Sequence, residues 1–168
     1  MKFELKRWKD KYLYDLQKYA DNPNIARWLR DAFPTPYTIE DAVTYIDGRL
    51  SADDSAELCR AIVVDGEAVG SVGVFVGTDV YRRSAELGYW LAEKYWRCGI
   101  MSEAVRMICR EAFDKFDIVR IYAEPYADNV ASRRVLNNAG FRLEGTMERG
   151  VYKNGEMHDY CMYALLKE

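Results

Sequence analysis

The chain has 168 residues, of which 49% are hydrophobic and 14% aromatic, and its net charge of −3 comes from acidic and basic residues that are interspersed along it. This length suits one domain with an ordinary core and is short for two. Basic residues form pairs such as Arg82-Arg83 but no longer run, and no apolar run reaches the 18 or so residues of a membrane span, so neither a nucleic-acid partner nor a membrane is expected.

The cysteines and the N-terminus indicate a reduced, cytoplasmic protein. The four cysteines lie far apart without a C-x-x-C motif, which fits neither zinc ligands nor a small disulfide framework. His158 is the sole histidine, so no two-histidine metal site is possible and no metal is expected. Residues 1–7 alternate in polarity and lack the apolar stretch of a signal peptide.

The first third of the chain is expected to be mostly helical. An alternating segment, 3–8, predicts a strand, and apolar residues at helical spacing follow over 12–20. Asn22-Pro23 is typical of a helix start, here of a short helix that carries Ile25, Trp28 and Leu29. Thr38 is expected to cap a further helix that runs to Leu50.

The remaining elements alternate strands with helices. Segments 58–64 and 68–76 flank Asp65-Gly66 as a hairpin, and the glycines at 70 and 73 mark a bulge or a close backbone approach. The later elements expected are a strand at 84–91, a helix at 102–116, a strand at 119–124, a helix at 129–139 stopped by Gly140, and a hairpin of 146–152 with 157–166. This order predicts one α/β domain, residues 1–168, with a mixed sheet covered by helices on both faces.

The loop before the helix at 102–116 is a candidate anion site. A helix N-terminus presents unpaired N–H groups and a partial positive charge, and Gly99 lets the backbone approach a ligand closely. Ser102 is a reasonable cap whose hydroxyl could reach a phosphate. Taken alone, the loop fits equally well a glycine that is needed only to turn the chain.

Asn129 and Ser132 lie three residues apart, hence on one face at a helix start. Both can hydrogen-bond amides, carbonyls or a thiol. The alternative is that Asn129 merely caps the helix and Ser132 completes its first turn.

Four motifs, in this order, resemble the GNAT superfamily of N-acetyltransferases. They are Glu-Leu-Gly-Tyr-Trp-Leu at 86–91, Tyr-Trp-Arg-Cys-Gly-Ile-Met-Ser-Glu-Ala at 95–104, Asn-Val-Ala-Ser at 129–132, and Gly-Phe at 140–141. The first motif and the closing Gly-Glu-Met-His-Asp-Tyr at 155–160 are similar to the RimJ/RimL group, whose members acetylate N-terminal amines of ribosomal proteins and whose close relatives acetylate small amines.

The resemblance implies acetyl-CoA as the donor and a largely antiparallel sheet in which two parallel strands, 84–91 and 119–124, splay apart around the pantetheine arm. The amides of the loop would hold the pyrophosphate. The implied cofactor contacts are Tyr89, Trp90, Leu91, Arg97, Cys98, Gly99, Ile100, Met101, Ser102, Asn129 and Ser132.

The loop departs from the usual pattern, Gln/Arg-x-x-Gly-x-Gly/Ala. Trp96 and Met101 stand at its first and last places, Arg97 stands where the subgroup usually has Gly, and Cys98 where it usually has Lys. These changes are tolerable if backbone amides bind the phosphates, and Arg97 could add a contact.

Acetylation needs a neutral amine, and a carboxylate of raised pKa could accept its proton. Glu86 is the first candidate because it lies beside the expected thioester, although an outward-facing charge or a structural hydrogen bond would also explain it. Glu124, near the end of the adjacent strand, and Asp159 are weaker candidates.

The group that protonates the departing thiolate must also be found. Many GNAT enzymes use a tyrosine four residues before the Gly of the Gly-Phe pair, but Leu136 stands there, which leaves Ser132. A covalent mechanism through Cys98 would need a base, and His158 is remote in sequence.

The acceptor is expected to be a primary amine, either a small molecule or a protein N-terminus, and the transfer to be direct, in a ternary complex. Where the family places its groove, the lining residues would be Trp28, Phe33, Tyr37, Tyr152 and Tyr160. The alternative is an acetyl-CoA-binding regulatory module without catalysis. The chain is expected to be a monomer or a homodimer.

Overall fold

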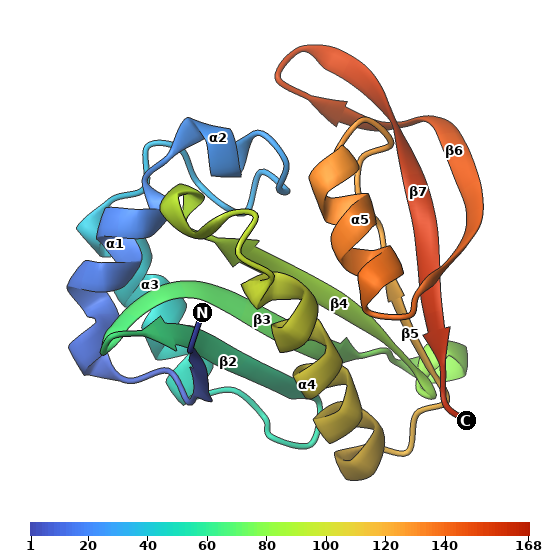
Figure 1. Ribbon diagram of the computed structural model, residues 1–168, viewed down its shortest axis with the longest axis horizontal. Coiled ribbons are helices and arrows are strands. Elements are labelled where there is room, and N and C mark those ends of the chain that lie inside the picture. The colour runs from blue at the N-terminus through green and yellow to red at the C-terminus, as the bar shows by residue number, and fades with distance from the viewer.

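The computed structural model describes all residues, 1–168, and contains one seven-stranded sheet in the order β1-β2-β3-β4-β5-β7-β6 (Figure 1). The strands are β1 (Glu4–Lys6), β2 (Glu57–Val64), β3 (Glu67–Val76), β4 (Ser84–Leu91), β5 (Arg120–Ala123), β6 (Arg142–Lys153) and β7 (Glu156–Leu166). Every neighbouring pair is antiparallel except β4 with β5. This confirms the predicted α/β fold with a mixed, largely antiparallel sheet.

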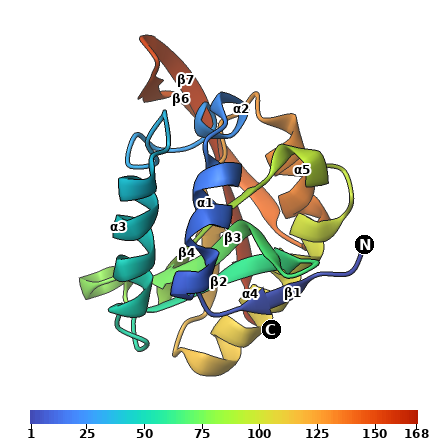
Figure 2. The ribbon, with the colours of Figure 1, turned by 90° about the vertical axis from the view of Figure 1, so that its left-hand side faces the viewer.

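Helices cover both faces of the sheet, α1 and α3 on one and α4 and α5 on the other (Figure 2). They are α1 (Leu13–Ala20), α2 (Pro23–Ala26), α3 (Ile39–Leu50), α4 (Ile100–Lys115) and α5 (Val130–Asn138). Two contacts fix the faces: Ser71 of β3 meets Tyr45 of α3, whereas Arg60, which pairs with the next residue of β3, bonds Glu111 of α4. Neighbouring residues of a strand point to opposite faces, so α3 and α4 lie on opposite sides.

The helix caps are largely those that the sequence predicts. Thr38 and Asp41 form a reciprocal capping box at α3, and the Asn22 side chain accepts from the Asn24 amide at α2. Helix α2 ends at Ala26, earlier than expected, so Trp28 lies beyond it in a turn.

Both predicted hairpins are present. In the first, Asp65 and Gly66 adopt φ values of 50° and 86°, the left-handed pair that a two-residue turn requires. The register of β2 and β3 shifts at Ile62, and a Cβ added to the neighbouring Gly70 would lie 2.5 Å from the Trp90 carbonyl oxygen. This glycine therefore marks both a bulge and a close approach.

Three expected boundaries need correction. Strand β1 is only three residues long, against the six expected over 3–8. Strand β6 begins at Arg142 rather than at residue 146, because shifts of register near Gly145 and after Met147 interrupt the alternation by which a strand is recognised. Helix α4 begins before Ser102.

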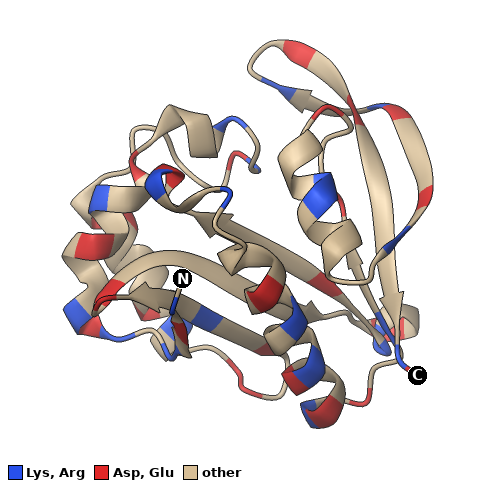
Figure 3. Ribbon diagram, in the orientation of Figure 1, with Lys and Arg blue, Asp and Glu red and all other residues tan.

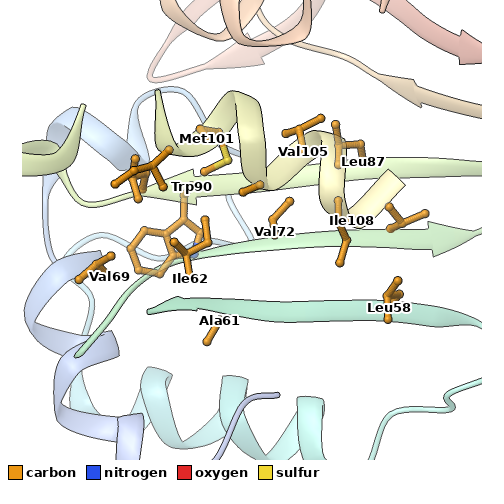
Figure 4. Close-up of a cluster of buried hydrophobic side chains, with 14 of the residues drawn as sticks. Leu58, Ala61, Ile62, Val69, Val72, Leu87, Trp90, Met101, Val105 and Ile108 are labelled. Atoms are coloured by element: carbon orange, nitrogen blue, oxygen red, sulfur yellow. The ribbon is translucent and has the colours of Figure 1, made fainter. Parts of the chain in front are cut away.

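Helix α4 supplies much of the core on its face of the sheet. Met101, Val105 and Ile108 point towards Val72 and Leu87 of the strands below (Figure 4). Positively and negatively charged residues are interspersed along the ribbon (Figure 3).

Candidate active site

Strands β4 and β5 pair over three residues only and then separate (Figure 1). The last pair is Glu86 with Tyr122, whereas β4 continues to Leu91. The splay that the family resemblance implies is therefore present between the two strands.

One side of β4 exposes backbone groups to this splay. The Ser84 carbonyl accepts from Gly77, and the Ala92 amide donates to Val69, so even-numbered residues direct their peptide groups towards β3. Peptide groups alternate along a strand, so those of the odd-numbered residues face away from β3. The Glu86–Tyr122 pair is the last one with β5, so the amides of Tyr89 and Leu91 face the splay without a strand partner.

Helix α4 begins at Ile100, with Gly99 as its N-cap in the left-handed conformation at φ 76°. The prediction that Ser102 caps this helix is wrong, because Ser102 is the third residue of its first turn. The first intrahelical bond runs from the Glu103 amide to the Gly99 carbonyl at 3.3 Å. The amides of residues 100–102 precede this bond and stay free for an anion.

The loop side chains fall into two groups. Ile100 and Met101 are buried in the core, while Arg97 and Cys98 are exposed. A Cβ on Gly99 would meet no atom within 4 Å, so the space beside this glycine is open. Arg97 has φ 62°, which explains why glycine is usual at this place in the subgroup.

On the α5 side of the splay, Tyr89 and Ser132 form a close pair. The Tyr89 hydroxyl lies 2.6 Å from Ser132 Oγ and 3.3 Å from the Ser132 carbonyl oxygen. Burial raises the pKa of Tyr89, which keeps the phenol neutral. Asn129 Oδ1 accepts from the Ser132 amide at 3.2 Å, so Asn129 caps α5 and holds this serine in place.

The next two residues of β4, Trp90 and Leu91, make contacts of a different kind from those of Tyr89. The Trp90 ring points to the opposite face and packs edge-on against Phe33, with 5.9 Å between ring centroids. The Leu91 carbonyl accepts from Trp96 Nε1 at 2.7 Å. This bond ties the strand end to the loop before α4.

Two carboxylates meet on the α1 and α3 face, where β4 and β5 begin to part. Glu86 and Glu124 share one cation, Arg30, which contacts Glu86 directly and lies 3.6 Å from Glu124 Oε2. Tyr122 donates to the other oxygen of Glu86 at 3.4 Å. The Glu86 and Glu124 side chains are 27% and 31% exposed, so both are reachable from solvent.

The pKa of Glu124 lies above its ordinary value. Partial burial raises the pKa of Glu124 first, and the nearby Glu86 charge raises it further, while Arg30 opposes the rise. Such a carboxyl group is suited to accept a proton near neutral pH.

Asp159, the remaining carboxylate candidate, lies in other surroundings, and Leu136 stands where many GNAT enzymes have a tyrosine. Asp159 Oδ1 accepts from the Arg149 amide at 2.8 Å, where Arg149 adopts φ 52° in the β6 bulge. Leu136 is fully buried in the core.

Aromatic side chains gather around Tyr126, a residue that sequence reasoning missed. Trp28 meets Tyr126 edge-on at 6.1 Å, and His158 stacks on Tyr126 at 5.6 Å. Tyr160 pairs with Tyr126 through a β-bridge. Phe33 is half-buried, whereas Tyr152 is well exposed on β6 and Tyr37 is buried in the core.

The loop after α2 and the tip of the β6–β7 hairpin are joined above this site. Lys153 Nζ donates to Asp31 Oδ1 at 2.9 Å, and the Tyr126 hydroxyl donates to the Leu29 carbonyl at 3.3 Å. Lys153 and Arg30, like Tyr126, were missed from the sequence. No local motif marks them, and their partners are 56 to 122 residues away.

No group of three or more His, Cys, Asp or Glu side chains in the structure could hold a metal ion. None of the helices combines the length and the apolar character needed to cross a membrane.

The site's geometry fits a nucleotide thioester. Free amides at the start of α4 suit a pyrophosphate, and the unpaired peptide groups of β4 suit the amides of a pantetheine arm. A strand splay, a helix start with free amides and a nearby carboxylate pair together suit an acyltransferase that uses a coenzyme A thioester.

Comparison with known proteins agrees. A family model described as acetyltransferase (GNAT) domain matches residues 2–142. YoaA of Bacillus subtilis, named as an uncharacterized N-acetyltransferase, is 34% identical over 101 residues, which are 60% of this chain and 56% of YoaA. YdaF of Bacillus subtilis, whose name assigns it provisionally to ribosomal N-acetylation, is 30% identical over 149 residues, which are 89% of this chain and 75% of YdaF.

A solved structure has the same fold. RimL, a ribosomal L7/L12 alpha-N-protein acetyltransferase in complex with coenzyme A, superposes with a TM-score of 0.86 at 25% identity, over 98% of this chain and 93% of that one. The chain belongs to the GNAT family of acetyltransferases, in its RimJ/RimL-like group. It is an N-acetyltransferase that uses acetyl-CoA as the donor and an amine as the acceptor.

Proposed function

We propose that the acceptor is the terminal ammonium of a polypeptide and that Glu86 and Glu124 receive it. The observation that carries this proposal is the pair of accessible carboxylates on one face of the sheet, where β4 and β5 part. Bound acetyl-CoA supplies a thioester that reacts with neutral amines. Glu86 holds the ammonium by charge, and Glu124, with its raised pKa, takes the proton.

Ser132 completes the proposed chemistry from the other side of the splay. Tyr89 fixes the Ser132 hydroxyl at 2.6 Å, so this hydroxyl is oriented before the substrates arrive. We assign to Ser132 the hydrogen bond that stabilises the departing sulfur. Strand β4 thereby joins the two halves of the site, because it carries Glu86 towards one face and Tyr89 towards the other.

Two observations favour a polypeptide end over a polyamine. YdaF, which is similar in sequence over 89% of this chain, is named for ribosomal N-acetylation, and RimL, which acts on a ribosomal protein N-terminus, is 25% identical to this chain. A polyamine would need further carboxylates for its other cations, yet Asp31 is engaged by Lys153, and Asp159 by the Arg149 amide.

We also propose that residues 1–168 act as one cytoplasmic domain, as a monomer or a homodimer, without a nucleic-acid or membrane partner. The single sheet, which includes strands from both ends of the chain, supports one domain. The mixed charges in Figure 3 support the absence of a nucleic-acid partner.

A thiol-release assay over four acceptors tests the proposed function. These are a short peptide with a free N-terminus, the same peptide N-acetylated, spermine, and an aminoglycoside. We expect turnover with the free peptide alone. Turnover confined to spermine or to the aminoglycoside would contradict the proposed acceptor, and acetyl-CoA binding without turnover on any amine would indicate a regulatory module.

The same assay separates the two carboxylates. Glu124→Gln should lower kcat by about 10²-fold or more and flatten the acid limb of the rate–pH profile, since a proton acceptor is lost. Glu86→Gln should mainly raise the acceptor KM. Glu144→Gln, which alters an exposed carboxylate paired with Arg120, is the matched control and should change neither. An unaltered acid limb in the Glu124 variant would remove this residue from the mechanism.

A further inference from the structure

Arg30 lies where the proposed acceptor ammonium must bind. It is the cation shared by Glu86 and Glu124, and one guanidinium nitrogen, Nη2, serves both carboxylates. Both oxygens of Glu86 already accept a hydrogen bond in this arrangement, Oε1 from Arg30 and Oε2 from Tyr122. A substrate cation that binds Glu86 therefore competes with Arg30.

We propose that Arg30 is a displaceable occupant of the ammonium site, which the acceptor replaces on binding, and thus a residue that determines acceptor specificity. The inference rests on the proposed function for the position of the acceptor. Exchange of one cation for another conserves the charge beside the two carboxylates. A neutral acceptor would instead leave two adjacent carboxylates without a counter-ion, which is unfavourable.

The surroundings of Arg30 allow the side chain to move while the backbone stays. Its side chain is 69% exposed, and exposed ion pairs are weak and screened by water. The residues on either side are held, because the Leu29 carbonyl accepts from Tyr126 and Asp31 accepts from Lys153. The backbone at Arg30 is therefore held near the site, while the side chain is able to leave the two carboxylates.

The kinetic test is Arg30→Met, which keeps the aliphatic stem and removes the competing cation. We expect the acceptor KM to fall by about two- to fivefold, the range that matches the strength of exposed ion pairs. The acid limb of the profile should move to higher pH, because Arg30 opposes the rise in the pKa of Glu124 that burial and Glu86 cause. Arg30→Lys should stay close to wild type in both respects.

Arg110→Met is the matched control. Arg110 is an exposed residue of α4, on the other face of the sheet, and its replacement makes the same change in net charge. This variant should leave the KM and the acid limb unchanged. An acceptor KM that rises in Arg30→Met, or stays equal to that of Arg110→Met, would overturn the proposal, since Arg30 would then be a partner of the acceptor or a mere structural contact.

A second measurement is independent of turnover. Methylguanidine, a small copy of the Arg30 head group, should raise the Tm of Arg30→Met at millimolar concentration and should not raise that of wild type or Arg110→Met. Equal responses in the three proteins would overturn the proposal. If wild type acetylated no amine, the proposed function would fail, whereas the methylguanidine result would still decide whether Arg30 fills a cation site.

Discussion

Gly99 shows at the scale of one residue how the donor site depends on the backbone. It ends the loop with φ 76°, a conformation that side chains oppose, and the space beside it is open. A bulky residue there would both strain the loop and cover the amides of residues 100–102.

We predict that Gly99→Trp weakens acetyl-CoA binding by at least about tenfold, measured by calorimetry. Gly99→Ala is the control that separates the two effects, because it imposes a strain of roughly 1–2 kcal/mol at the left-handed position but adds almost no bulk. Gly99→Ala should therefore lower the Tm and change the affinity far less. Equal affinity in the Trp variant and in wild type would show that the pyrophosphate lies elsewhere.

At the scale of elements, the Lys153–Asp31 ion pair joins the loop after α2 to the tip of the β6–β7 hairpin. Lys153 is only 6% exposed, whereas its partner Asp31 is 86% exposed, so one end of this ion pair is buried and the other is in water. Removal of the partner of a buried charge costs more than removal of an exposed pair.

Asp31→Ala should accordingly lower the free energy of unfolding by about 1–2 kcal/mol, between the values typical of exposed and of buried pairs. Asp117→Ala, in which the lost partner Arg83 is well exposed, should cost less than about 0.5 kcal/mol. Lys153→Met should be less harmful than Asp31→Ala, because it removes the buried charge itself. Denaturant unfolding measures the free energy of unfolding of all three variants. Equal losses of stability for the two aspartate variants would show that the Lys153–Asp31 ion pair adds no more stability than an exposed pair.

Elements with strong local signals could be predicted from the sequence. Strand β4 was predicted with its observed bounds, and the capping box of Thr38 marked the start of α3. The start of α4 could not be placed from the sequence. Ser102 is a residue type that often caps helices, whereas the N-cap in the structure is Gly99. Nothing local reveals which of the two a helix will use.

At the scale of the whole molecule, the sheet separates the two half-sites. Ser132, Tyr89 and the start of α4 lie on one side of the splay, and Glu86 and Glu124 lie on the other. Donor and acceptor can therefore be bound together.

We predict a sequential kinetic mechanism. Initial rates measured against both substrates should give intersecting double-reciprocal lines, and coenzyme A should compete with acetyl-CoA but not with the amine. Parallel lines would indicate a covalent acetyl-enzyme, in which case Cys98, the exposed thiol beside the donor site, would be the first residue to replace.

The contacts that sequence reasoning missed are those that depend on the complete fold. Arg30 and Glu86 are 56 residues apart, and Lys153 and Asp31 are 122 apart. Glu86 and Glu124 could be named as candidates from the sequence, because Glu86 belongs to a recognisable strand motif and Glu124 lies near the end of the adjacent strand. The cation between them comes from an irregular loop that no motif marks.

The short pairing of β4 with β5 also bears on amide hydrogen exchange. The amides of a central strand ordinarily exchange slowly, because each is bonded to a neighbour on one side or the other. In β4 beyond Leu87 only alternate amides are protected in this way, since those of Tyr89 and Leu91 face a gap that no strand fills. The middle of the sheet thus contains a row of readily exchanging protons, whose protection reports directly on whether the pantetheine arm is in place.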